Sequence, residues 1–215
     1  MSANASLCPA PPLTGSHLPH MRFSVSEISE LIKHRRTIYP KDYSSREVHR
    51  EVVERVLTNA TWAPTHGLTQ PWRFTVFSGV AREKLSSFLG ETYRAQTPPE
   101  KFLQKKFENI TQRPLQSTVV IGIGMARDPK GRISARDEQW AVACAVQNMH
   151  LTCAAYGLGA FWSTVGAATG DAMREFLGLG PDGSAMGLFF IGYPAGDWPS
   201  GHRRPLETVT TWLSA

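Results

Sequence analysis

The sequence predicts one globular domain in which helices and strands alternate. Its 215 residues and 41% hydrophobic content suffice for a sizeable core, although length alone also allows two small domains. Segments with apolar residues at helical spacing alternate with short strand-like segments. The chain shows no internal repeat and no long low-complexity tract. We therefore expect both structure types to share one folded unit.

Residues 1–21 are expected to lie outside this unit. They are rich in Pro and Ser and lack the continuous apolar stretch of a signal peptide or membrane anchor. We interpret them as a mobile tail before a domain over 22–215, with Met21 as a second candidate start site. The three cysteines form no CxxC pair, which favours reduced thiols and a cytoplasmic location. Cys144 and Cys153 are expected to be small buried residues of a helix.

Several helices are predicted from capping patterns and apolar spacing. Ser24 and Glu27 form a capping box before a helix that runs to about Arg36. Ser44 and Glu47 repeat this pattern before a second helix that Pro64 stops. Further helices are expected near 80–89, 102–110, 135–156 and 171–177. Polar residues interrupt 135–156, so we interpret it as a core helix and not a membrane span.

Strands are predicted at 72–77, where residue character alternates, and at 118–125, which is almost continuously apolar. A continuous apolar run is typical of a central strand buried on both faces. Shorter strands are expected at 160–163 and 186–193. The final segment, 194–215, ends in Val209, Trp212 and Leu213, which require a partner surface.

Several chemistries lack support in the sequence. There is no HExxH, CxxC or GxSxG motif, as zinc or serine hydrolases would require. Gly122 and Gly124 lack the third glycine of a dinucleotide fingerprint, so close packing explains them better. The net charge of +5 is spread over short basic runs, which suit solvated faces or phosphate-bearing partners. A nucleic-acid-binding module using these runs and exposed aromatic residues remains an alternative.

Three separated segments carry residues suited to ligand binding. Arg35-Arg36-Thr37 offers two guanidiniums and a hydroxyl that can bind a phosphate, although helix-dipole compensation also explains them. The segment 62–74 combines Trp, Pro, His66 and Gln70 in a rigid platform for a flat polar ring. Core packing of each Trp and an ordinary loop position for His66 are the alternatives. The segment 157–166 offers strand-end amides and hydroxyls beside aromatic rings.

Together these segments resemble the nitroreductase family, most closely its small members. The family's helix-end Arg-Arg-Ser appears as Arg35-Arg36-Thr37, and its Ala-Pro loop with Gln-Pro-Trp-x-Phe spans 63–74. Gly157-Leu158-Gly159 follows the longest helix, and Gly192-Tyr193-Pro194 precedes Arg203-Arg204-Pro205-Leu206-Glu207. The motifs follow the family's order and cover nearly everything after Met21. Three positions depart from the family pattern: Tyr39 and Gly201 replace basic residues, and Leu68 replaces an asparagine.

The resemblance implies an α+β fold, with a mixed, mainly antiparallel central sheet wrapped by helices, in an intertwined homodimer. It implies FMN between the subunits. Arg35, Thr37 and Arg203 are expected to hold the phosphate, with Arg36 and Arg204 nearby. The ring is expected to contact Trp162, Ser163 and Thr164 of the same chain and Trp62, His66 and Gln70 of the second chain.

The implied activity is that of a flavoprotein oxidoreductase with ping-pong kinetics. A hydride passes from NAD(P)H to flavin N5 and then to a small organic acceptor such as a nitroaromatic, quinone or enone. No side chain is expected to be an obligatory acid or base, and no metal, nucleic acid or membrane is expected to bind. The sequence leaves open the acceptor and the choice between NADH and NADPH. A flavin-binding protein of the same fold without turnover is a further alternative.

Overall fold

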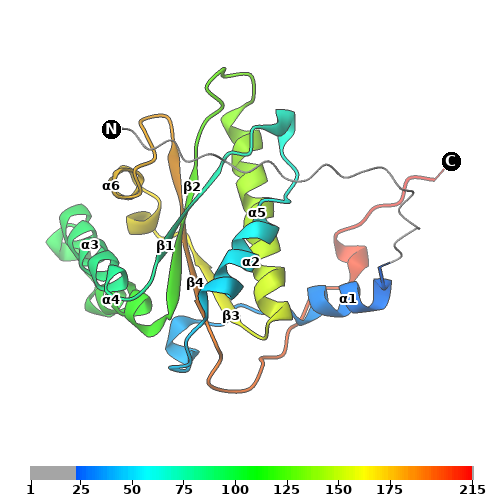
Figure 1. The fold of residues 1–215 in the computed structure, drawn as a ribbon, viewed down its shortest axis with the longest axis horizontal. Coiled ribbons are helices and arrows are strands. Elements are labelled where there is room, and N and C mark those ends of the chain that lie inside the picture. Colours follow the sequence, from blue (N-terminus) through cyan, green and yellow to red (C-terminus); the bar gives the residue numbers. More distant parts are fainter. Residues whose placement is uncertain (1–22, 215) are drawn as a thin grey trace, which may run out of the picture.

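The computed structural model describes residues 23–214, so the predicted tail over 1–21 lies outside the described residues. A four-stranded sheet has the order β1 (Trp72–Phe77), β2 (Val119–Met125), β4 (Ser184–Gly192) and β3 (Gly159–Ser163) (Figure 1). Its three strand pairs are antiparallel. A parallel bridge between Thr37 and Ala160 adds the chain after the first helix to the edge at β3. The predicted mixed, mainly antiparallel sheet is confirmed.

Helices cover both faces of the sheet. On one face lie α2 (Arg50–Ala60) and α5 (Ala135–Ala155), and on the other α3 (Ala81–Gln96), α4 (Gln104–Gln116) and α6 (Asp171–Phe176) (Figure 1). All seven residues of β2 are buried because both faces are covered. This confirms the prediction of a central strand from the apolar run.

Gly122 and Gly124 of β2 provide space for side chains of the segment after α6. A Cβ atom at Gly122 would lie 2.6 Å from Cδ2 of Leu177, and one at Gly124 would lie 2.5 Å from Cδ2 of Leu179. Both distances are far shorter than real contacts of a Cβ atom. The glycine pair is therefore explained by packing.

The two predicted capping boxes have different outcomes. At α1 (Val25–His34) the backbone N–H of Glu27 donates to Ser24 Oγ at 3.3 Å, as predicted. The prediction at Ser44 was wrong, because α2 begins only at Arg50 with His49 at its N-cap. The Ser44 hydroxyl instead donates to the carbonyl of Tyr193 at 3.1 Å. This long-range contact ties the chain before α2 to the end of β4.

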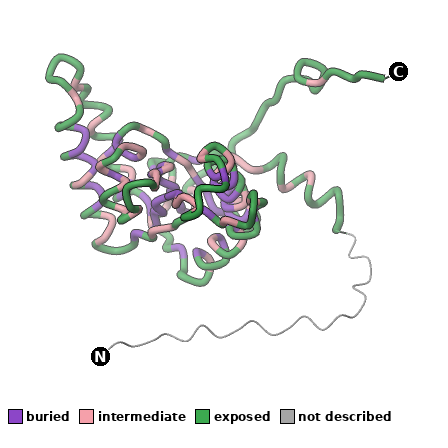
Figure 2. Tube along the Cα trace, turned by 90° about the horizontal axis from the view of Figure 1, so that it is seen from above, coloured by how far each residue is buried: buried purple, intermediate pink, exposed green. Residues whose placement is uncertain are grey.

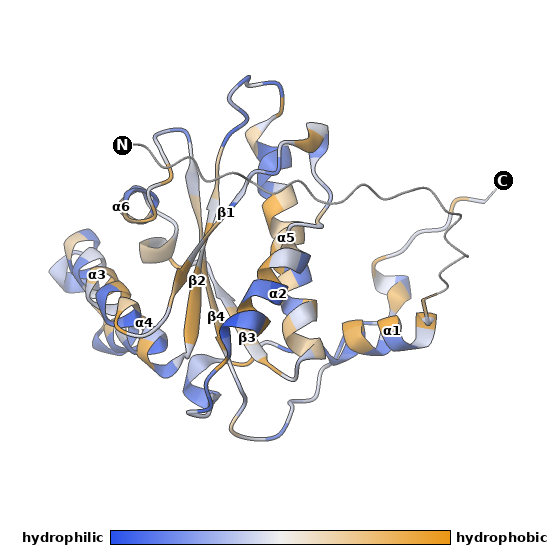
Figure 3. Ribbon diagram, viewed as in Figure 1, coloured by the Kyte–Doolittle hydropathy of each residue, from blue (hydrophilic) through white to orange (hydrophobic). Residues whose placement is uncertain are grey.

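Several apolar side chains of the described residues are exposed to solvent. Helix α1 and the segment after β4 extend from the body of the domain (Figures 1 and 2), and no residue of α1 is buried. Figure 3 shows hydrophobic residues on α1, and the end of the chain is exposed at Trp212 and Leu213. On α5, Trp140 and Cys144 are also exposed, which corrects the expectation of a buried Cys144, whereas Cys153 is buried. Such exposed apolar surface is typical of a protein–protein interface.

No helix within the described residues is long and apolar enough to span a membrane.

Candidate functional site

Three arginines lie together where the end of α1 meets the C-terminal segment. Arg35 is the C-cap of α1, and with Arg36 and Arg203 it lines a pocket of about 620 Å³. Burial lowers the pKa of Arg35, and the neighbouring charges of Arg203 and Arg36 lower it further. Within residues 23–214 none of the three forms an ion pair with a carboxylate. A partly buried cluster of cations without a counterion is suited to bind an anion.

Arg36 joins the two segments that form this pocket. Its Nε donates to the carbonyl of Pro199 at 3.0 Å, and its Nη1 donates to the carbonyl of Arg35 at 2.8 Å. The guanidinium occupies the space beside Gly201, where a Cβ atom would overlap Arg36 Cζ. A glycine at 201 thus gives room to a cation that comes from the end of α1. Gly201 replaces a basic residue of the family pattern, but Arg36 supplies a positive charge at this place in the pocket.

The segment after the arginines is fixed to β3. Thr37 bridges Ala160, and the backbone N–H of Ile38 donates to the Ala160 carbonyl at 3.2 Å. The ring of Tyr43 lies against Gly192, where a Cβ atom would overlap Tyr43 Cδ2. Burial raises the pKa of the Tyr43 hydroxyl, which donates to the carbonyl of Ile38 at 3.0 Å. The glycine of the Gly-Tyr-Pro motif therefore helps to hold Thr37 in place.

The departure at Tyr39 has a local explanation. Its ring packs against Phe161 of β3, with ring centroids 4.8 Å apart. Arg113 of α4 lies over the same Phe161 ring at 5.1 Å. A cation is thus present near β3 although position 39 carries none.

The end of β3 presents residues predicted to face the ring of a ligand. Trp162 is half-buried and its Nε1 donates to the carbonyl of Met186 at 2.9 Å. Ser163 is buried and Thr164 is exposed. Gly187 (φ 112°) allows this approach, because a Cβ atom there would overlap the carbonyl oxygen of Ser163. The indole of Trp162 is thereby fixed on the α5 face of the sheet.

The loop between α2 and β1 contains the remaining predicted site residues, and its backbone adopts an unusual conformation. Trp62, His66 and Gln70 are exposed, and Trp62 keeps 82% of its surface accessible. Leu68 (φ 55°) and Gln70 (φ 44°) are in the left-handed region, which costs a non-glycine residue about 1 kcal/mol or more.

Several hydrogen bonds stabilise this strained backbone conformation. The backbone N–H of Gln70 donates to Thr65 Oγ1 at 3.2 Å, and Arg73 donates to the Gln70 carbonyl at 3.0 Å. His66 Nδ1 lies 3.2 Å from Asp137 Oδ2 of α5. The loop is therefore held by β1 and α5 as well as by its own residues.

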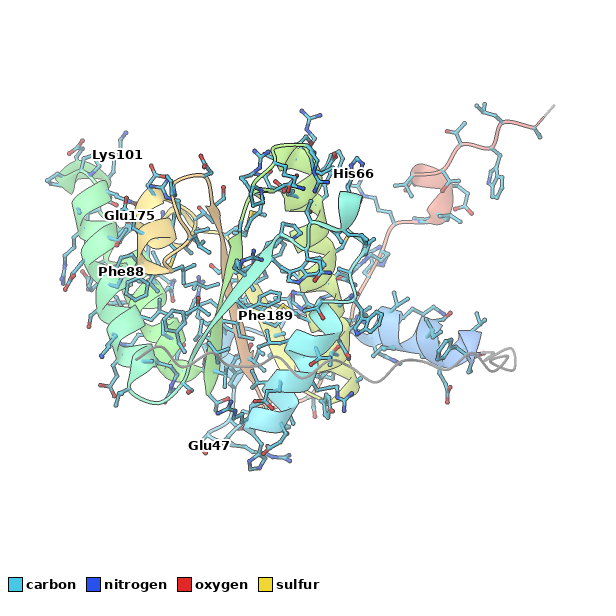
Figure 4. All side chains as sticks on the ribbon, turned by 45° about the horizontal axis from the view of Figure 1, so that its top comes forward. Glu47, His66, Phe88, Lys101, Glu175 and Phe189 are labelled. Carbon is cyan, nitrogen blue, oxygen red and sulfur yellow. The ribbon has the colours of Figure 1, made fainter. Side chains whose placement is uncertain are left out.

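The structure brings together only part of the predicted site within one protomer. Arg35, Arg36 and Arg203 line one pocket, and Thr37, the next residue after Arg36, bridges Ala160 of β3. The loop of His66 lies at the other end of α5 from α1 (Figures 1 and 4). The arginine pocket and the His66 loop therefore lie apart within one protomer.

Sequence reasoning missed His150, a buried residue of α5 near the arginine cluster. Its ring meets Phe189 edge-on at 4.7 Å, and Phe189 pairs in register with Trp162. Its Nδ1 has no hydrogen-bond partner among the described residues. Burial and the charge of Arg35 lower the pKa of His150 to about 4. The helical pattern only marked this residue as a polar interruption.

Comparison with known proteins identifies the family. The model of the nitroreductase family matches residues 32–193, which is most of the chain. The chain belongs to the nitroreductase family. The resemblance drawn from the arginine, Gln-Pro-Trp and Gly-Tyr-Pro motifs is therefore confirmed.

Individual relatives extend over nearly the whole chain. The nitrobenzene nitroreductase of Ectopseudomonas oleovorans is 26% identical, over 86% of this chain and 96% of its own length. A nitroreductase-like protein of Bacillus cereus has the same fold, with a TM-score of 0.74, 24% identity and coverage of 90% of this chain and 100% of its own. A protein of Desulfovibrio desulfuricans, solved in complex with FMN, has a TM-score of 0.63 at 25% identity, with coverage of 87% and 97%.

We predict that His150 makes this nitroreductase-family protein less stable in acid. The unfolded chain takes up the proton near pH 6.5, but the folded protein only near pH 4. Between these values the unfolded state binds more protons, so the free energy of unfolding decreases as the pH is lowered, by up to about 3 kcal/mol. Urea unfolding at pH 7, 5.5 and 4.5 in phosphate-free buffer measures this loss.

The variant His150→Leu should lose less stability than the wild type over this range. His202→Gln, which changes an exposed histidine, should follow the wild type. Equal losses in His150→Leu and in the wild type would contradict the assignment.

Proposed function

We propose that the protein is an FMN-dependent oxidoreductase that uses NAD(P)H to reduce a small organic acceptor. The family membership and the FMN complex of the Desulfovibrio relative support the cofactor. The name of the Ectopseudomonas relative supports a nitroaromatic or similar acceptor. When bound, FMN supplies hydride transfer at N5, first from NAD(P)H and then to the acceptor, with ping-pong kinetics. Free cysteines favour a cytoplasmic location.

The observation that carries this proposal is the arginine cluster, in which no guanidinium forms an ion pair with a carboxylate of the described residues. Arg35 and Arg203 repel each other in a partly buried pocket, and a phosphate dianion would relieve this repulsion while accepting their N–H groups. Thr37 directly follows Arg36 and its backbone is fixed to Ala160, so its hydroxyl would be a further donor to the phosphate. The residues present therefore fit the phosphate end of FMN. Arg36 would add charge, although its guanidinium also serves to hold the C-terminal segment.

The remaining contacts follow the expected division between two chains. Trp162, Ser163 and Thr164 would contact the ring from the protomer that binds the phosphate. Trp62, His66 and Gln70 would contact it from the second protomer, which their exposure and the place of His66 at the far end of α5 from α1 support. This arrangement requires a homodimer.

The exposed apolar residues would form the faces of this dimer. Trp140 of α5 keeps 60% of its surface accessible, and Trp212 in the extended C-terminal segment keeps 84%. A protomer alone leaves both in water, whereas an intertwined dimer would bury them.

Replacing Arg35 by alanine is expected to remove FMN from the purified protein. The bound phosphate would lose a charged donor, which costs about 1.5–3 kcal/mol and weakens binding by about tenfold to a hundredfold. Absorbance at the flavin band, divided by protein concentration, gives the occupancy. Arg50→Ala removes an equal charge from an exposed position on α2 and should keep full occupancy. Full occupancy in Arg35→Ala would refute the phosphate assignment.

We expect Trp140→Glu to convert a dimer into monomers in light scattering. The change places a charge on the exposed face of α5, where burial against a partner would desolvate it. Val80→Glu is the control, because Val80 is similarly exposed but lies at the start of α3, over the opposite face of the sheet. A wild type that is monomeric and still binds one FMN per chain would contradict the two-chain site.

A further inference from the structure

We propose that Asp137 is a positioning residue for His66, holding the imidazole by Nδ1 so that Nε2 can deliver a proton to the acceptor. The proposal rests on the proposed function, because the acceptor is the molecule reduced in that reaction. It assigns His66 a role as proton donor, which water can replace at a lower rate.

The contact itself links the loop to a rigid part of the fold. Asp137 Oδ2 lies 3.2 Å from His66 Nδ1. Asp137 is in the first turn of α5, a helix of 21 residues, and its backbone N–H donates to the N-cap Ser134 at 3.1 Å. Its side chain is 31% exposed, against 66% for that of His66. The carboxylate is therefore the fixed partner, and the imidazole is the group that it orients.

The loop is also supported beside this contact. Gly67 lies on Ile133, where a Cβ atom would be 3.1 Å from Ile133 Cδ1. The left-handed Gly67, Leu68 and Gln70 turn the chain directly after His66. His66 thus sits at the start of a turn whose path is fixed by Ile133 and by the segment before β1. Most of its ring remains open to the surroundings of the loop.

Other charged groups near this loop are engaged elsewhere. Glu138, the next residue of α5, is buried and accepts from Arg127 Nε at 2.5 Å. Arg73 of β1 donates to backbone carbonyls of Gln70 and Trp72, and Arg132 pairs with Asp128 at 3.0 Å. Asp137 is therefore the charged side chain that faces the imidazole.

The chemistry of the pair determines which nitrogen is free. An ionised carboxylate only accepts hydrogen bonds, so Nδ1 must carry the proton of the contact. Nε2 then carries the second proton of the imidazolium, and it is unprotonated in the neutral ring. A fixed Nδ1–H thus makes Nε2 the position from which a proton leaves and to which it returns.

This assignment suits acceptors that gain negative charge on oxygen. Reduction of a quinone to a hydroquinone adds one hydride and one proton. The hydride goes to one oxygen, and the Nε2–H bond breaks to give the other oxygen its proton. Neutral His66 keeps Nδ1–H on Asp137 and recovers the second proton from water. Reduction of a nitro group to a nitroso group and water consumes the same hydride and proton. General-acid catalysis of this kind accelerates such a step.

The first test measures the tautomer of His66, independently of turnover. In ¹⁵N NMR of the full-length holoprotein, the neutral His66 ring should carry its proton on Nδ1. Asp137→Ala should move the proton to Nε2, and Asp137→Glu, which keeps a carboxylate, should restore the Nδ1 form. Ser134→Ala is the matched control, because it removes the hydrogen bond to the backbone N–H of Asp137 but leaves both side chains of the pair in place. An unchanged tautomer in Asp137→Ala overturns the proposal.

The second test uses stopped-flow on the same variants with NADH or NADPH and a quinone such as menadione. Asp137→Ala and His66→Ala should each slow the oxidative half-reaction by at least about tenfold at neutral pH. The double variant should be no slower than His66→Ala, because the two residues act as one unit. Flavin content and reduction by NAD(P)H should be unchanged in Asp137→Ala and Ser134→Ala.

The outcomes separate the two proposals. An oxidative half-reaction that is unaffected in Asp137→Ala, or equally slowed in Ser134→Ala, overturns the positioning role while the oxidoreductase proposal stands. A wild type that binds no FMN, or whose FMN is not reduced by NAD(P)H, overturns the proposed function and with it the proton delivery. In that case the tautomer measurement still decides whether Asp137 orients His66.

Discussion

The repulsion among Arg35, Arg36 and Arg203 is the constraint on which the site depends. Three guanidiniums share one pocket, and within residues 23–214 none of them forms an ion pair, since Glu30 of the same pocket pairs with Lys33 and His34. The fold maintains the cluster by other contacts, since Arg36 binds a backbone carbonyl of the C-terminal segment and Tyr43 fixes the following residues to β3 and β4. A bound dianion would turn this unfavourable electrostatic energy into binding energy. Part of the positive net charge of the chain would thus serve to bind an anion at this pocket.

The second half of the site is a loop with a strained backbone that hydrogen bonds hold in place. The loop after α2 places Leu68 and Gln70 in left-handed conformations that only a network of local contacts can maintain. The side chains of Trp62 and Gln70 in this loop are exposed. Apolar residues of α1, α5 and the C-terminal segment are exposed as well. Dimerisation would explain both observations together, because it covers the apolar faces and brings the loop to the arginines.

Local sequence patterns predicted the parts of the fold that local physics determines, such as the buried strand β2 and the core helix α5. The local patterns failed where a polar side chain forms its hydrogen bond with a residue distant in the sequence. Ser24 caps its helix as its pattern predicts, whereas the Ser44 hydroxyl is bound to the carbonyl of Tyr193, which no local pattern reveals. Asp137 likewise resembled an ordinary acidic residue of a first helical turn, and its contact with His66 exists only because the loop folds onto α5. The family motifs located the candidate site and predicted the division between phosphate and loop residues, and the tertiary structure adds that Arg35, Arg36 and Arg203 line one pocket.

The most direct test of this account compares the binding of FMN and riboflavin to flavin-stripped protein by fluorescence titration. The two ligands share the ring and the ribityl chain, and only FMN carries the phosphate that the arginine cluster would bind. Two charge-assisted contacts of about 1.5–3 kcal/mol each predict that FMN binds at least about a hundredfold more tightly. The preference should shrink at high ionic strength. Equal affinity for FMN and riboflavin would contradict the account, because the arginines would then have no role in holding the flavin.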